Sequence, residues 1–227
     1  RTIAISHATQ ALLTAAPVAL ELAELFKKEG HTLALVGGPV RDAILGRLGN
    51  DLDFTTSARP DLTSKILKKW ADAIWETGAQ FGTIAAKHGD LTIEVTTYRS
   101  ESYDPNSRKP DVDFGDSIEG DLGRRDFTVN AMALELTTTP PTFIDLFDGV
   151  NDLARKVLRT PGTAENSFSD DPLRMMRAAR FAAQLGFDVD PTILVAIKEM
   201  ASRIEIISAE RIRDEFVKLI MSQNPRI

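Results

Sequence analysis

The chain has 227 residues and a formal net charge of −6; 43% of its residues are hydrophobic and 26% are charged. A chain of this length can bury a substantial core in one large or two small domains. It contains no cysteine, which excludes disulfides and thiolate metal sites, and its three histidines are scattered. No apolar run has the length of a membrane span and no signal peptide is recognisable, so we expect a cytoplasmic protein without a membrane partner.

The acidic balance does not by itself indicate a nucleic-acid partner, because nucleic-acid-binding proteins usually present a basic patch. The sequence begins at Arg1 rather than at Met, and it stops at Ile227 directly after a helical pattern. We therefore expect a fragment of a longer protein, whose remaining part could carry the missing positive charge.

Residues 1–30 are predicted to form an N-terminal helical segment that packs against the following part. Pro17 suits the first position of a helix. Apolar residues such as Leu22 and Phe26 then recur at helical spacing, and the pattern ends near Gly30. We assign no chemistry to this segment.

The stretch from Leu33 to Thr56 is typical of a phosphate-binding site. A buried strand is predicted at Leu33–Val36, and Gly37 and Gly38 separate it from a helical pattern. Glycines let backbone N–H groups converge on an anion without obstruction from Cβ atoms, and Arg41 adds a positive charge in the first helical turn.

Carboxylates follow on neighbouring strands. The strand that ends this stretch places Asp51 and Asp53 on one face, and a hairpin of residues 81–86 and 91–98 carries Glu94. Carboxylates this close repel one another unless a cation lies between them, and hard oxygen ligands suit Mg²⁺. We predict a metal site with Glu94 as the third ligand. The alternative is that Gly-Gly turns and Asp-x-Asp loops are common, and that Glu94 is an ordinary surface residue.

A polar stretch precedes a pair of arginines. Residues 99–121 contain Pro105 and Pro110 and few apolar side chains, so we predict a long mobile or functional loop. Arg125 and Asp126 follow it, next to a further arginine. Paired arginines suit contacts with phosphate or ribose, and an Arg–Asp ion pair at a helix start is the alternative.

A boundary between two domains is predicted at about residue 149. A last strand is indicated at Thr142–Phe147, and helical patterns replace strand patterns after it. One of these helices is expected to start at Ser169–Pro172, where a capping residue, acidic residues and a proline coincide, and to stop near Gly186. Two further amphipathic helices are predicted, at residues 191–200 and 209–221.

The first of these helices carries arginines three residues apart, at Arg174, Arg177 and Arg180. Apolar residues surround the helix, so we expect it to be largely buried, and buried arginines need anionic partners. Asp171 lies one turn before Arg174. This pair suits the Watson–Crick edge of cytosine or adenine, because a carboxylate accepts from the amino group and a guanidinium donates to the ring nitrogen. Uracil and guanine reverse that pattern. The alternative is an i,i+3 ion pair beside solvated arginines.

Five motifs, in this order, resemble the signatures of the tRNA nucleotidyltransferase (CCA-adding) and bacterial poly(A) polymerase family. They are GGPVRD with DLD (37–53), RRDFTVNAMA (124–133), the connector at Asp148-Gly149, DDPLRMMRAARF (170–181) and AERIRDEFVKLIM (209–221). Asp170 stands where the family usually has Glu, so it receives no role.

The resemblance implies an α+β fold, in which a nucleotidyltransferase head with a small mixed β-sheet and flanking helices (31–148) precedes an all-α neck (149–227). It also implies template-independent transfer of nucleotides from CTP and ATP to the 3′ end of tRNA. Two Mg²⁺ ions would be bound by Asp51 and Asp53, with Glu94 assisting. The implied nucleotide-binding residues are Gly37, Gly38, Arg41, Arg125, Asp126, Asp171, Arg174, Arg177 and Arg180.

Three alternatives stay open. A bacterial poly(A) polymerase shares the fold and most motifs, but the basic string that we associate with those enzymes is absent between Thr56 and Phe81. A partial enzyme that adds only CC or only A has the same signatures. A non-catalytic nucleotide- or RNA-binding regulator is the alternative of another class, and the acidic residues argue against it, because such a regulator needs no metal carboxylates.

Overall fold

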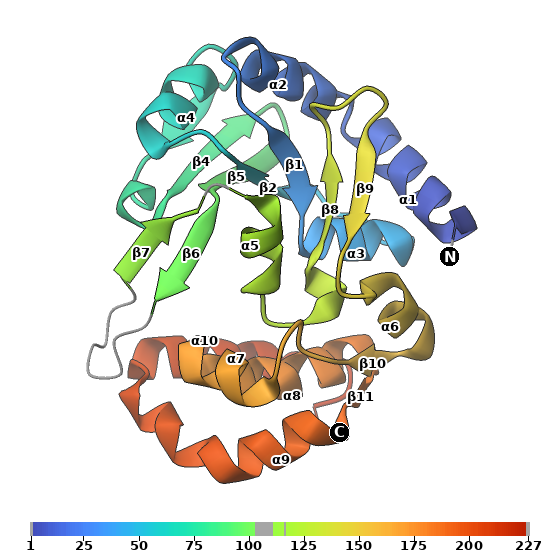
Figure 1. Ribbon diagram of the computed structural model, residues 1–227, viewed down its shortest axis with the longest axis vertical. Coiled ribbons are helices and arrows are strands. Elements are labelled where there is room, and N and C mark those ends of the chain that lie inside the picture. Colours follow the sequence, from blue (N-terminus) through green and yellow to red (C-terminus); the bar gives the residue numbers. More distant parts are fainter. Residues whose placement is uncertain (1, 103–110, 116, 226–227) are drawn as a thin grey trace.

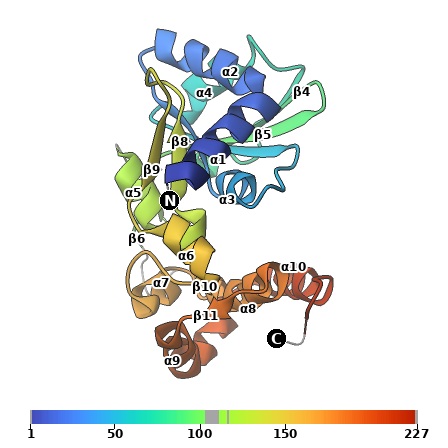
Figure 2. The ribbon, with the colours of Figure 1, turned by 90° about the vertical axis from the view of Figure 1, so that its right-hand side faces the viewer.

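The computed structural model describes residues 2–102, 111–115 and 117–225, and it has a β-sheet part followed by a helical part (Figure 1). Helix α6 (Gly149–Arg155) lies between these two parts in both views of the ribbon (Figure 2). A mixed sheet with flanking helices, followed by a mainly helical part, confirms the predicted α+β class. The boundary at residue 149 stays a prediction.

Seven strands form the main sheet. They are β1 (Leu33–Val36), β2 (Asp51–Thr56), β3 (Ala73–Trp75), β4 (Thr83–His88), β5 (Leu91–Thr97), β8 (Met132–Glu135) and β9 (Thr142–Asp145). Their order is β3-β4-β5-β2-β1-β8-β9; β2 and β5 pair in parallel and the other neighbours pair antiparallel. The predicted strands and hairpin are present, and the short strand β3 was not predicted.

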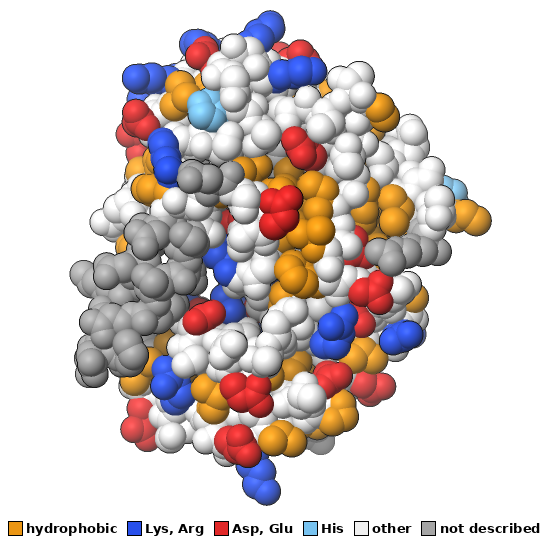
Figure 3. All heavy atoms as spheres, viewed as in Figure 1, with side chains coloured by type: hydrophobic (Ala, Val, Ile, Leu, Met, Phe, Trp, Pro, Cys, Tyr) orange, Lys and Arg blue, Asp and Glu red, His pale blue; other side chains and the backbone are white. Residues whose placement is uncertain are grey.

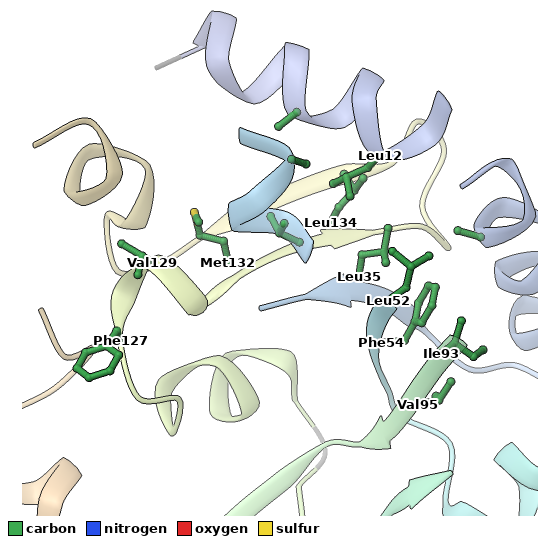
Figure 4. Close-up of a cluster of buried hydrophobic side chains, with 14 of the residues drawn as sticks. Leu12, Leu35, Leu52, Phe54, Ile93, Val95, Phe127, Val129, Met132 and Leu134 are labelled. Atoms are coloured by element: carbon green, nitrogen blue, oxygen red, sulfur yellow. The ribbon is translucent and has the colours of Figure 1, made fainter. Parts of the chain in front are cut away.

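Alternation along β2 places apolar side chains on one face of the sheet and carboxylates on the other. Leu52 and Phe54 are buried, whereas Asp51 and Asp53 are exposed on the opposite face. The buried face belongs to a hydrophobic cluster that includes Leu35 and Ile93 of neighbouring strands (Figure 4). Period-two alternation therefore places the carboxylates away from the core, as the sequence predicts.

The first two helices, α1 (Thr2–Ala15) and α2 (Pro17–Lys28), pack on this part of the molecule (Figure 2). Leu12 of α1 and Phe26 of α2 are fully buried in the same cluster as the sheet residues. Among the described residues, no single helix is long and apolar enough to cross a membrane; α1 and α2 reach that length and composition only as a pair bent by 85°.

Two shorter helices connect the strands. Helix α3 (Gly38–Ile44) follows β1, and helix α4 (Pro60–Leu67) follows β2. The predicted stripe continues to Leu48, but α3 ends one turn earlier because Gly46 takes a left-handed conformation with φ 70°.

The prediction of a structureless loop at 99–121 is wrong at both of its ends. Strands β6 (Arg99–Ser102) and β7 (Asp111–Phe114) pair antiparallel, and helix α5 (Ile118–Gly123) begins inside the predicted loop. The Ser117 side chain caps α5 by accepting a hydrogen bond from the Gly120 N–H, which accounts for a helix in so polar a stretch. Pro105 and Pro110 lie outside the described residues.

The helical part departs from the prediction in two respects, since it is not purely α-helical and its Ser169–Asp170 segment does not start a helix. Its elements, besides α6, are α7 (Ala164–Asp170), α8 (Leu173–Leu185), α9 (Pro191–Met200) and α10 (Ala209–Ile220), with the short strands β10 (Val157–Leu158) and β11 (Asp188–Val189). Ser169 and Asp170 end α7 instead of starting α8. Asp171 caps α8, because its Oδ1 accepts from the Leu173 N–H at 3.1 Å, and α8 ends at Gly186 as predicted.

Gly149, where α6 begins, allows a close approach of two backbone segments. A Cβ atom at this position would lie 2.4 Å from the Thr128 carbonyl oxygen and 3.0 Å from Met132 Cγ. Thr128 belongs to the segment that leads into β8, and Met132 is the first residue of β8. A side chain here would therefore push α6 away from the sheet part.

We predict that Gly149→Ala destabilises the protein by about 1–3 kcal/mol, since the added methyl group overlaps a backbone atom that cannot move independently. The matched control is Gly162→Ala, because a Cβ atom there meets nothing within 4 Å. Urea unfolding at neutral pH measures both variants. Equal midpoints for the two variants would contradict the close-approach argument.

Candidate active site

A cleft of about 1000 Å³ lies between the sheet part and α8, and eleven of the twelve predicted site residues line it. The residue that does not line it is Asp51. Figure 3 shows Lys and Arg side chains inside the hollow between the two parts. The residues that sequence patterns single out at separate places in the chain thus come together in one cleft.

The Gly37-Gly38 segment forms one wall of the cleft. Gly37 has φ 71°, and a Cβ atom on it would lie 3.0 Å from Arg125 Nη1, so glycine is required there. Arg41, in α3, is largely buried. It donates to both carboxylate oxygens of Asp42 at 2.9 Å and to Asn130 Oδ1 at 2.6 Å. These contacts fix its guanidinium group in the cleft wall.

Asp53 and Glu94 face the cleft from adjacent strands. They are register partners in the parallel pairing of β2 with β5. Partial desolvation and, next, the negative charge of Glu94 raise the pKa of Asp53, although Arg125 acts in the opposite direction. Two carboxylates held side by side in this way are a pair that a cation would stabilise.

The cleft contains two of the three predicted metal ligands, Asp53 and Glu94. Asp51 lies at the start of β2, opposite Thr92, and outside the cleft. Within the described part of the chain, no three acidic or histidine side chains are grouped closely enough to hold a metal ion. Asp53 and Glu94 nevertheless fit Mg²⁺, which is commonly bound by one or two carboxylates that substrate phosphates complete.

Asp126 is the centre of a buried hydrogen-bond network that joins the two parts of the molecule. Its Oδ2 accepts from Arg177 Nε at 2.8 Å and from Arg177 Nη2 at 2.6 Å. Its Oδ1 accepts from Asn130 Nδ2 at 3.0 Å and from the Phe127 N–H at 2.8 Å. Burial alone would raise the pKa of Asp126, but Arg177, the hydrogen bond from Asn130 and the charge of Arg174 together hold this pKa below its ordinary value.

Arg125 does not pair with Asp126. The fully buried Asp121, in α5, accepts from Arg124 Nη2 at 2.9 Å and from Arg125 Nη2 at 3.1 Å. Burial by itself raises the pKa of Asp121, but Arg125 and Arg124 together hold it below its ordinary value. The acid that pairs with both arginines is therefore Asp121 of the preceding helix, not Asp126, and it fixes both arginines at the cleft.

The arginines of α8 each have a partner. Arg177 donates to Glu215 at 3.4 Å, and Arg180 donates to the other oxygen of this carboxylate, which α10 supplies. Arg174 donates to Ser167 Oγ at 3.0 Å and to the Arg124 carbonyl oxygen. The buried carboxylate of Glu215 therefore holds the positive charges of Arg177 and Arg180 close together.

Asp171 and Arg174 do not form the i,i+3 ion pair that we considered. Within the described residues, Asp171 Oδ2 accepts from Arg211 Nη2 at 2.8 Å, while Arg174 has the partners given above. Both side chains still line the cleft. Asp171 and Arg174 therefore present their polar atoms to the same cleft without pairing with each other.

The charge of the cleft is opposite to that of the chain. Eight arginines and four carboxylates line it among the described residues, although the whole chain carries −6. The lining residues that received no role from the sequence include Arg99, Asn130, Phe181 and Arg211. Asn130 belongs to the RRDFTVNAMA motif, and Arg211 belongs to the predicted helix at residues 209–221, in which we named no site residue. The cleft suits an anionic ligand with several charges.

A family model described as "Poly A polymerase head domain" matches residues 33–159, which is more than half of the chain. The chain belongs to this poly(A) polymerase head-domain family. A second model, described as "Probable RNA and SrmB- binding site of polymerase A", matches residues 186–227. These two matches confirm the family resemblance inferred from the motifs.

Curated members of the family are similar along nearly the whole chain. The CCA-adding enzyme of Leuconostoc citreum is 43% identical over 221 residues, which are 96% of this chain and 52% of that protein. The CCA-adding enzyme of Enterococcus faecalis is 43% identical over 211 residues, which are 92% of this chain and 49% of that protein. The chain thus spans about half the length of the curated relatives it matches. CCA-adding nucleotidyltransferases of this family are generally metal-dependent.

Solved structures of the family share the fold. The Bacillus stearothermophilus CCA-adding enzyme in complex with CTP has a TM-score of 0.79 and 37% identity, and the match covers 92% of this chain and 49% of that one. The Thermotoga maritima CCA-adding enzyme complexed with tRNA_CCA has a TM-score of 0.77 and 28% identity, with 93% and 48% covered. The head and neck arrangement of this chain is therefore that of the family.

The pKa of Asp121 leads to a prediction about stability. A carboxylate with a lowered pKa stabilises the fold above the unfolded-state pKa, about 3.9, and this contribution is lost as the pH falls through the folded-state pKa. We expect Asp121→Asn to lower the free energy of unfolding by about 1–3 kcal/mol at pH 7, because two arginines lose a charged partner.

Urea unfolding between pH 7 and pH 3 measures this effect, and the difference between Asp121→Asn and the unsubstituted chain should shrink below about pH 4. The control is Asp214→Asn, because Asp214 pairs with Arg213 on the exposed surface, where such pairs contribute little. A difference for Asp121→Asn that stays constant with pH would contradict the ion-pair explanation.

Proposed function

We propose that the protein catalyses template-independent, Mg²⁺-dependent transfer of nucleotides from CTP and ATP to the 3′ end of tRNA, which is CCA addition. The observation that carries this proposal is one cleft with a carboxylate pair on the sheet and a row of arginines opposite, on α8. The similarity to CCA-adding enzymes over more than nine tenths of the chain supports the same activity. The reaction would take place in the cytoplasm.

Asp53 and Glu94 would hold Mg²⁺ at the reacting end of the cleft, and Asp51 is the third ligand that we propose for a two-ion site. These carboxylates would hold Mg²⁺ where it could supply Lewis-acid chemistry, that is, a lower pKa of the RNA 3′-hydroxyl and neutralisation of charge on the triphosphate. The carboxylates themselves position this chemistry beside the Gly37-Gly38 wall, where phosphates can approach the backbone.

The arginines and Asp126 would bind the triphosphate and the ribose. Arg41, Arg177 and Arg180 border the cleft, and their guanidinium groups suit phosphate oxygens. Arg125 and Asp126 lie beside them and would contact the sugar and its phosphate. A bound triphosphate would compete with the carboxylate of Asp126 for Arg177, so nucleotide binding and the contact between head and neck are linked.

Asp171 and Arg174 would select the base. A carboxylate that accepts from an amino group and a guanidinium that donates to a ring nitrogen match cytosine and adenine, and they leave unsatisfied groups against uracil and guanine. Arg211 holds Asp171 from α10, and Ser167 holds Arg174. Selection by protein side chains would need no nucleic-acid template.

The first test uses the protein expressed from its complete gene, Mg²⁺ and labelled tRNA that ends before CCA, with each nucleotide alone and in mixture. Product length on a gel gives the answer. Two C and one A followed by a stop establish CCA addition. A long A ladder identifies a poly(A) polymerase, which the description of the family model favours as the second candidate. CC alone or A alone identifies a partial enzyme, and nucleotide binding without extension identifies a regulator.

We predict that Asp53→Ala lowers the rate of nucleotide addition roughly a thousandfold while CTP still binds, because a lost metal ligand removes several kcal/mol of transition-state stabilisation. Asp51→Ala tests the third ligand in the same assay. Asp90→Ala, in the exposed turn between β4 and β5, is the control and should retain activity. Full activity of Asp53→Ala would rule out the proposed metal site.

We predict that Arg174→Ala lowers the preference for CTP over UTP by about ten- to a hundredfold, because the mismatched base no longer leaves a buried donor unsatisfied. Single-nucleotide addition with each triphosphate measures the ratio of kcat/KM values. Arg213→Ala is the control, since Arg213 is exposed on α10 and outside the cleft. An unchanged ratio in Arg174→Ala would refute base selection by this residue.

A further inference from the structure

Phe181 places one aromatic ring beneath three arginines. It lies on α8, is 6% exposed and lines the cleft. The guanidinium carbon of Arg180 lies 4.1 Å from the ring centroid, that of Arg41 lies 5.3 Å away, and that of Arg177 lies 5.4 Å away. All three distances are within the range in which the ring quadrupole attracts a cation.

The three arginines come from both parts of the molecule. Arg177 and Arg180 share α8 with Phe181, and Arg177 lies one helical turn before it. Arg41 reaches the same ring from α3, beside the Gly37-Gly38 wall. The ring therefore joins an arginine of the head to two arginines of the neck, at the place where the two sides of the cleft meet.

A contact with Phe127 fixes the orientation of the Phe181 ring. Phe127, which is fully buried, meets Phe181 edge-on, with a centroid distance of 5.7 Å and an interplanar angle of 81°. Phe127 directly follows Asp126, whose carboxylate accepts from Arg177. A tilt of the Phe181 ring would thus disturb both its contact with Phe127 in the core and its contact with Arg177.

Three guanidinium groups gathered around one ring repel one another, and each of them has a carboxylate partner whose negative charge opposes this repulsion. Asp42 holds Arg41, Asp126 holds Arg177, and Glu215 is shared with Arg180. The ring adds an attraction common to all three cations without competing for their hydrogen-bond donors. Those donors are what phosphate oxygens require.

We infer that Phe181 is a positioning residue for the triphosphate of the incoming nucleotide: its ring holds the three arginines in a convergent arrangement before the nucleotide binds. This inference rests on the proposed function, because it needs a nucleoside triphosphate as the ligand. If Phe181 has this role, the affinity for the triphosphate depends on the attraction of its ring for cations. If Phe181 only fills the core, only the shape of its side chain matters.

The test replaces Phe181 with mono-, di- and trifluorinated phenylalanine, which keeps the shape of the ring and progressively weakens its attraction for cations. The protein is expressed from its complete gene, and calorimetry in Mg²⁺ measures the Kd of CTP and of CMP. We expect the Kd of CTP to rise stepwise to about tenfold across the series. The Kd of CMP should stay constant, because CMP lacks the β- and γ-phosphates that the three arginines would bind.

Phe26, which is fully buried in α2 and away from the cleft, is the control, and the same fluorinated series there should change neither Kd. A flat CTP series at Phe181, or an equal rise for CMP, would overturn the inference and leave the proposed function intact. Absence of CTP binding by the unsubstituted protein would overturn both the proposed function and the inference.

Discussion

The ion pair between Asp126 and Arg177 holds the site together. The carboxylate comes from the segment that leads into β8, and the guanidinium comes from α8, 51 residues later. Because Asp126 is buried and its pKa is lowered, it is charged at neutral pH, and a buried charge without its partner is costly. The sheet part and the helical part therefore have one favourable relative position, in which this pair is made.

Other contacts at the junction follow from that pair. Asn130 accepts from Arg41 and donates to Asp126, so it links the glycine-containing wall to the same carboxylate. Glu215 extends the network from Arg177 to α10. A ligand that exchanges places with any of these carboxylates acts on both parts at once.

Local patterns predicted most of the fold and of the site. Alternation along β2 placed Asp51 and Asp53 on the exposed face. The arginines that the sequence singled out at intervals of three residues on α8 all line the cleft. The pairs that organise the cleft could not be predicted, since Asp126 with Arg177 and Asp121 with Arg125 depend on which elements meet in space. The polar stretch after Arg99 misled us for a related reason: the β6–β7 hairpin is held by backbone pairing, which leaves no apolar pattern to detect.

Parallel pairing of β2 with β5 also restricts where residues can be inserted or deleted in the chain. Asp53 and Glu94 face the cleft together because each strand keeps its register, and successive side chains point to opposite faces. A one-residue deletion inside β5 ahead of Glu94 would turn this carboxylate toward the hydrophobic cluster and expose Ile93 or Val95 in its place. Insertions and deletions are thus tolerated in the connecting turns, and the two strands that carry the carboxylates must keep their length as related sequences diverge.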